Sequence, residues 1–209
     1  MGRRTVLIVS LGLALAGCSS GTAAKAKATR ASVQVPAGMH RVTGLDGALS
    51  VGVPDTWTNV DLAPAKITAS LQHAGLKDPA AKAQLEQLQA LRALYVLDIG
   101  SRARSSARFG TNLNAFCTDS PGTDVKALKQ AAPGQMQRAG GQQIQVTDVT
   151  VDGLAAIRVA YGLTGGSLSG LQVQVPVKGK VCSITFTTDQ PARYQPVFDA
   201  MIPTIRLPY

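Results

Sequence analysis

Few residues in this chain could support acid–base, metal or nucleophilic chemistry. The 209 residues include only 2 His and 12 Asp and Glu, and charged residues make up 16% of the sequence. His40 and His73 lie far apart, and neither has a second His or a Cys at the spacing of zinc ligands. The sequence has no D-x-D-x-D-G calcium loop and no G-K-[ST] phosphate loop. We therefore expect no catalytic residues, no metal and no cofactor.

Two further patterns could suggest a site, and both have simpler explanations. The string Gly165 to Gly170 is similar to a nucleophile elbow, but Leu168 stands where that motif has its Ser. Asp46, Asp55 and Asp61 cluster near Trp57, although turns and strand ends also favour Asp. A hydrolase with an unrecognised carboxylate pair remains the less favoured alternative.

The first eighteen residues form the strongest motif. Arg3 and Arg4 precede the apolar stretch Val6 to Ala16, as in an export signal. As a helix, this stretch would span about 16 Å, roughly half of a hydrocarbon core of about 30 Å. Leu15-Ala16-Gly17-Cys18 resembles the bacterial lipobox. The resemblance implies that a diacylglyceryl group, with palmitate among its acyl chains, joins the Cys18 thiol and that the signal peptide is then cleaved before Cys18. An ordinary secretory signal with an incidental Cys is the alternative.

This motif divides the chain into three expected parts. Residues 1–17 are the lipoprotein signal peptide, residues 18–34 are the lipidated Cys18 and a flexible tether, and residues 35–209 are one folded domain. We expect the protein on the outer face of a bacterial cytoplasmic membrane, held by its lipid anchor. The formal charge of +9 includes two signal-peptide arginines, and nucleic acid is not an expected partner of an exported protein.

The tether and one later segment carry clusters of cations. Lys25, Lys27 and Arg30 of the tether could contact anionic headgroups or remain solvated. Arg102, Arg104 and Arg108 alternate with small residues, which favours a solvated edge strand over an anion-binding surface.

The two remaining cysteines favour a disulfide. Cys117 and Cys182 are an even pair in an oxidising compartment, and Cys182 shares the predicted buried face of Ile184 and Phe186. A bridge between them would stabilise the fold by roughly 4 kcal/mol through loop closure. Two separate buried thiols are the alternative, and no C-x-x-C suggests a redox role.

Periodicity and turn residues predict an α+β domain with a central antiparallel β-sheet flanked by α-helices that pack on one face. Asp46-Gly47, Asp152-Gly153 and Gly179 mark hairpin turns. Pro133 is expected to break or kink its helix. The predicted strands are 39–43, 48–53, 94–103, 111–118, 142–151, 154–163, 171–178, 182–187 and 204–207, and the predicted helices are 64–74, 79–91, 124–139 and 191–201.

The stretch Val51-Gly52-Val53-Pro54-Asp55-Thr56-Trp57 resembles the entry of the PsbP-like fold. The run from Gly179 to Leu207 is similar to the end of those domains and of the LpqN/LpqT group of actinobacterial lipoproteins. The resemblance implies a noncatalytic envelope protein that binds an apolar or lipid ligand, or that assists a membrane protein such as a transporter. It transfers no ligand residues. A structural lipoprotein that engages cell-wall polymers is the main alternative.

Overall fold

The computed structural model describes residues 34–44, 47, 49–73, 79–105, 110–163, 165–166 and 168–208. Cys18, the tether cations, Asp46 and Arg108 lie outside these residues. The strands are β1 (Met39–Thr43), β2 (Ser50–Pro54), β3 (Thr58–Asn59), β4 (Leu94–Leu97), β5 (Asn112–Asp119), β6 (Gly141–Val151), β7 (Leu154–Leu163), β8 (Ser169–Val177) and β9 (Lys180–Thr188). The helices are α1 (Ile67–His73), α2 (Pro79–Ala90), α3 (Ser101–Arg104), α4 (Val125–Arg138), α5 (Pro191–Met201) and the 3-10 helix η1 (Ile202–Thr204).

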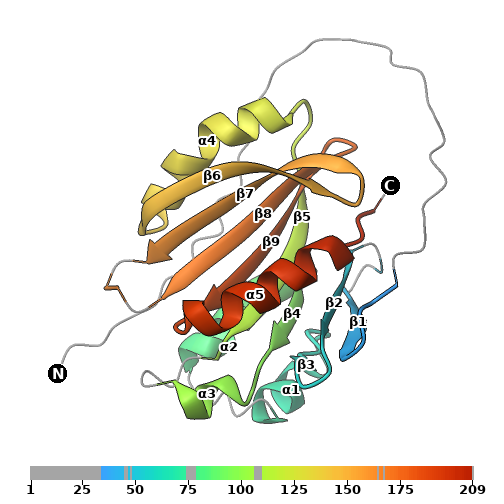
Figure 1. Ribbon diagram of the computed structural model, residues 1–209. Coiled ribbons are helices and arrows are strands. Elements are labelled where there is room, and N and C mark those ends of the chain that lie inside the picture. The colour runs from blue at the N-terminus through green and yellow to red at the C-terminus, as the bar shows by residue number, and fades with distance from the viewer. Residues whose placement is uncertain are drawn as a thin grey trace.

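Seven strands form one antiparallel sheet in the order β3-β4-β5-β9-β8-β7-β6, and β1 pairs with β2 in a separate hairpin (Figure 1). The predicted α+β class with a central antiparallel sheet is therefore confirmed. The hairpin expected around Asp46-Gly47 joins β1 to β2, although Asp46 itself lies outside the described residues.

Helices cover both faces of the sheet, so the expectation of helices on one face was wrong. Tyr194, Phe198 and Met201 of α5 pack on one face, against buried residues such as Ile184 and Phe186; we call this the α5 face. On the opposite face, which we call the α4 face, α4 covers the β6–β7 side and α1 with α2 covers the β3–β4 side. Successive side chains of a strand point to opposite faces of the sheet, so each strand contributes residues that pack against the helices on both faces.

Two predicted hairpins close with two-residue turns. Asp152-Gly153 joins β6 to β7, and Lys178-Gly179 joins β8 to β9. All four turn residues have positive φ, between 43° and 79°, as a type I′ turn requires.

Two of the predicted strands are replaced in part by helical turns. The strand predicted over 94–103 ends at Leu97, and α3 follows because the Asp98 carboxylate accepts a hydrogen bond from the Ser101 backbone N–H. The strand predicted over 204–207 is a 3-10 turn followed by a single bridge between Arg206 and Ser50.

The helix predicted over 124–139 runs through Pro133 to Arg138, so Pro133 does not break it. Leu128, Ala132 and Met136 are buried against β7, and this packing outweighs the roughly 3 kcal/mol cost of an interior proline.

Candidate functional site

A strip of uncharged polar side chains occupies the middle of the α4 face. The strand register places Asn114 of β5 opposite Thr185 of β9, and Thr185 opposite Gln172 of β8. One row away, Asn112 lies opposite Thr187, and on the other side Gln174 lies opposite Ser183. We call this set the polar strip: Asn112, Asn114, Gln172, Gln174, Ser183, Thr185 and Thr187.

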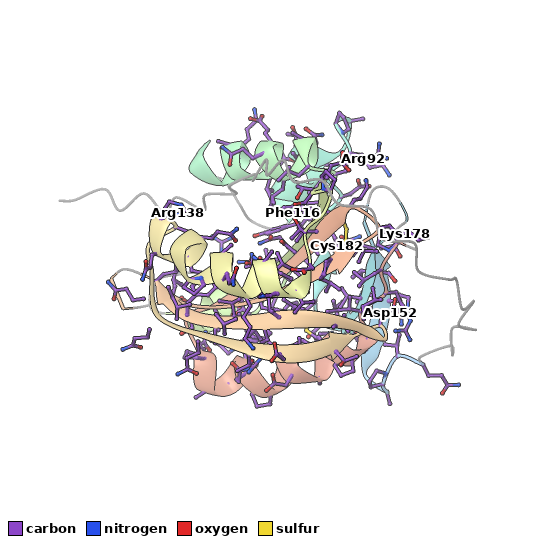
Figure 2. All side chains as sticks on the ribbon, turned by 90° about the horizontal axis from the view of Figure 1, so that it is seen from above. Arg92, Phe116, Arg138, Asp152, Lys178 and Cys182 are labelled. Atoms are coloured by element: carbon purple, nitrogen blue, oxygen red, sulfur yellow. A yellow bond between two sulfur atoms is a disulfide. The ribbon has the colours of Figure 1, made fainter. Side chains whose placement is uncertain are left out.

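Apolar clusters border the polar strip on both sides. Tyr95 and Leu97 of β4 pack with α1 and α2, whereas Ile157 and Val159 of β7 pack with α4. Figure 2 shows the half-buried Phe116 between the ribbons of α2 and α4. The strip is therefore a band of amide and hydroxyl side chains between two apolar clusters.

Most of the strip is buried although its residues are polar. Gln174 is 5% exposed and Asn112 is 3% exposed. The Gln174 Nε2 donates to Gln172 Oε1 at 2.7 Å, and the Gln172 Nε2 donates to Thr185 Oγ1 at 3.0 Å. This chain of hydrogen bonds fixes the two glutamine side chains.

Two acceptors of the strip have no donor. Gln174 Oε1 and Asn112 Oδ1 are buried, and no hydrogen bond reaches either of them in the part of the chain that the structure describes. A buried acceptor without a partner costs about 1–3 kcal/mol. Such atoms in a native fold call for a donor from a ligand or from ordered water.

Tyr161 forms the β7 border of the strip. Its ring lies across Gly170, where a Cβ atom would come within 2.2 Å of Tyr161 Cζ. Only glycine therefore allows this ring position. Burial raises the pKa of Tyr161 to about 12, so its hydroxyl keeps its proton at neutral pH.

The chemistry of the strip is hydrogen bonding rather than proton transfer. None of its seven residues is a carboxylate, a histidine or a cation. The arrangement can recognise hydroxyl or amide groups, but it offers no general acid or base. Alternation of polar with aliphatic residues, as at Gln172 and Gln174, is typical of a strand with one solvated face. Here Gln174 is buried, because helix layers flank the strip on both sides.

A second polar cluster fastens α3 to α5. Asp98 Oδ2 accepts from the Tyr194 hydroxyl at 2.5 Å and from Arg104 Nη2 at 2.9 Å, while Asp98 Oδ1 accepts from the Ser101 backbone N–H at 3.1 Å. Burial, followed by the hydrogen bond to Asp98, raises the pKa of Tyr194. Both carboxylate oxygens are thus engaged in holding two elements together.

This cluster corrects the expectation for the arginines. Arg102 and Arg104 lie on a short helix and not on an edge strand, and Arg104 bonds to Asp98 and to Tyr194. Nearby, Ser105 donates to Asp189, which ties the end of α3 to the residue after β9.

Cys117 and Cys182 are joined in a disulfide, with an S–S distance of 2.00 Å. They face each other in the β5–β9 register, on the α5 face, where Cys182 is buried and Cys117 packs against the same core. The bridge therefore lies on the side of the sheet away from the polar strip.

The other sequence candidates do not come together as a site. His40 lies 3.5 Å from Asp55 on the surface, and the side chain of His73 lies outside the described residues. Within the described ranges, no group of three or more His, Cys, Asp or Glu could hold a metal. A hollow of about 270 Å³ beside β3 is lined by Thr58, Asn59, Val60, Lys66, Ala69 and Ser70.

Comparison with solved structures identifies neighbours of the fold. The cyanobacterial PsbP protein (CyanoP) of Synechocystis has a TM-score of 0.50 and 13% identity, covering 87% of this chain and 98% of its own. LpqN of Mycobacterium tuberculosis, described as involved in cell envelope biogenesis, has a TM-score of 0.51 and 13% identity, covering 82% and 91%. No family profile and no curated protein matches the sequence. The similarity shows a shared PsbP-like fold.

Proposed function

We propose that this protein is a noncatalytic, lipid-anchored lipoprotein of the bacterial cell envelope that binds an amphiphilic molecule on the polar strip. The observation that carries the proposal is the pair of buried acceptors, Gln174 Oε1 and Asn112 Oδ1, which have no donor among the described residues. A ligand hydroxyl or amide would supply the missing hydrogen bonds and recover their desolvation cost.

The surroundings of these acceptors define the ligand. The strip has no charge, so it favours an uncharged headgroup with several hydrogen-bond donors over a phosphate or a carboxylate. The half-buried rings of Phe116 and Tyr161 border the strip and can contact an apolar portion of the same molecule. An envelope lipid with a hydroxylated headgroup meets both conditions.

One of the fold neighbours supports an envelope role without specifying a ligand. LpqN is involved in cell envelope biogenesis, and its fold is similar to this one at 13% identity. A membrane protein such as a transporter is the competing occupant of the strip, and a purely structural wall-associated role is the alternative without any ligand.

The strip and the Asp98 cluster both argue for binding over hydrolysis. A tethered hydrolase needs acidic or nucleophilic groups that converge and remain available to substrate. The strip contains hydroxyls but no carboxylate, histidine or lysine that could activate one of them as a nucleophile. Both oxygens of Asp98 already accept hydrogen bonds from Tyr194, Arg104 and Ser101.

The anchor has its own test. No helix within the described residues is long and apolar enough to span a membrane. If the lipid on Cys18 provides the attachment, Cys18→Ala moves the protein from the membrane fraction to the soluble fraction. A Cys18→Ala protein that stays in washed membranes would show that the anchor assignment is wrong.

Native mass spectrometry of the full-length protein from its own host tests the ligand. We expect an adduct on the wild type that is lost in Gln174→Met, which removes the unpaired oxygen at similar side-chain volume. The matched control is Gln145→Met, which changes an exposed glutamine of β6 outside the strip and should keep the adduct. A clean mass for the wild type, or an adduct that survives Gln174→Met, would contradict the proposal.

A further inference from the structure

Two turns at one end of the sheet carry cations at backbone positions that favour glycine or asparagine. Arg92 has φ 52° and Lys178 has φ 43°, both in the left-handed region. Figure 2 shows Arg92 and Lys178 on the same side of the molecule, with Arg138 on the opposite side.

Local hydrogen bonds explain the conformation of Arg92. The Ala93 N–H donates to Leu88 O at 2.9 Å and the Arg92 N–H donates to Gln89 O at 2.8 Å, which is the Schellman ending of a helix. Arg92 occupies the C′ position of α2, where glycine is the usual residue.

Lys178 occupies the first central position of the β8–β9 turn, where asparagine, aspartate or glycine is preferred. The chain thus keeps a long cationic side chain at two places where the backbone favours small residues. Nothing in the packing explains the choice, because both side chains are exposed.

The same end carries further positive charge. Lys126 lies in the first turn of α4, which follows β5 in the chain. The backbone hydrogen bond from the Ser120 N–H to Gly179 O joins that region to the β8–β9 turn. Lys180 pairs with Asp119 at 3.4 Å, while Asp124 caps α4. Figure 2 also places Asp152 on this side, where it is paired with Arg206.

The carboxylates therefore do not balance the cations of this end. Across the described part of the chain, Arg92, Lys126 and Lys178 form no salt bridge, whereas eight ion pairs bind most other charges. We call Arg92, Lys126, Lys178 and Lys180 the cationic end. In Figure 1 the blue strand β1 lies on the same side of the molecule as the β8–β9 turn.

We infer that the cationic end is the membrane-facing surface of the domain and that its partner is an anionic lipid bilayer. The inference rests on the membrane attachment in the proposed function. A cation near an anionic leaflet increases binding about fivefold, and the effect disappears with screening. Contact through this end would fix one orientation of the domain relative to the membrane.

Lysine labelling of the intact lipidated protein tests this contact. The protein is reconstituted in phosphatidylcholine vesicles, or in phosphatidylcholine with phosphatidylglycerol, and treated with a membrane-impermeant amine reagent. We expect Lys126 and Lys180 to react several-fold more slowly on the anionic vesicles, while Lys82 of α2 reacts at the same rate on both. Salt at 1 M, with a Debye length of about 3 Å, should remove the protection.

The test variant is Arg92→Gly with Lys178→Asn, because both new residues suit the left-handed backbone and leave the fold intact. This variant should lose the protection of Lys126 and Lys180, whereas Arg138→Gln at the opposite side should keep it. Equal labelling on both vesicle types, protection that survives the double variant, or equal loss in Arg138→Gln would overturn the inference. Release by Cys18→Ala and the adduct in native mass spectrometry report separately on the proposed function.

Discussion

Among single residues, Tyr194 has a hydroxyl whose removal should clearly destabilise the fold. It donates to the buried Asp98 carboxylate, and Arg104 Nη2 donates to the same hydroxyl at 2.7 Å. Tyr194→Phe leaves Asp98 with one donor fewer in a buried position, so we expect unfolding to become easier by about 1–3 kcal/mol.

Urea denaturation of Tyr194→Phe measures this loss. Tyr161→Phe is the matched control, because the Tyr161 hydroxyl makes no hydrogen bond to another described residue, so the change should stay below about 0.5 kcal/mol. If the two variants lost equal stability, the Asp98 cluster would have no special role.

Buried tyrosines also predict how stability depends on pH. Burial raises the pKa of Tyr95 and of Tyr161 to about 12 and raises that of Tyr194, from a usual value of 10.0. The neutral phenols are favoured in the folded state, so their stabilisation is complete below pH 10 and is lost as the pH rises towards 12. Tyr95 alone accounts for a loss of order 2–3 kcal/mol. Denaturation at pH 9 to 12 checks this, and a flat profile, or one unchanged in Tyr95→Phe, would contradict it.

At the level of the secondary-structure elements, replacing the cation in either left-handed turn position should stabilise the fold. Arg92→Gly and Lys178→Asn each place a preferred residue in a left-handed position, and each should raise the free energy of unfolding by about 0.5–1 kcal/mol. Arg138→Gly is the opposite control, because Arg138 lies in the last turn of α4 and glycine there should cost up to about 1 kcal/mol. Thermal denaturation measures whether each variant is more or less stable than the wild type. A loss of stability in Arg92→Gly would show that this arginine packs favourably.

The disulfide joins the two central strands β5 and β9. Its loss in Cys117→Ala with Cys182→Ala frees a loop that the bridge closes across a sequence separation of 65, which predicts about 4 kcal/mol of destabilisation. Chemical denaturation of the double variant measures this value. A loss much below 2 kcal/mol would contradict this prediction. It would show that the bridge adds little to the stability that the pairing of β5 with β9 already provides.

At the scale of the whole molecule, periodicity and turn residues were enough to predict the α+β class and most of the strands. Asp152-Gly153 and Gly179 closed the hairpins at the expected places, because type I′ turns depend on residues that the sequence displays directly. The same local reasoning failed at Asp98, whose side chain ends β4, and at Pro133, whose cost tertiary packing overrides.

The polar strip could not be predicted for a different reason. The residues Gln172, Gln174, Thr185 and Asn114 come from three strands, and only the register of the folded sheet places them side by side. Alternation along one strand distinguishes two faces, but it does not say whether a helix layer borders the polar one. Burial of the strip is therefore a property of the assembled layers.

A crystal structure of the full-length protein purified from its own host will show whether the polar strip holds a ligand. We predict ligand donor atoms within hydrogen-bond distance of Gln174 Oε1 and Asn112 Oδ1. Both oxygens are the buried acceptors that lack a partner among the residues described here. A structure in which donors from the protein itself satisfy both oxygens, with no ligand over the strip, would contradict the account.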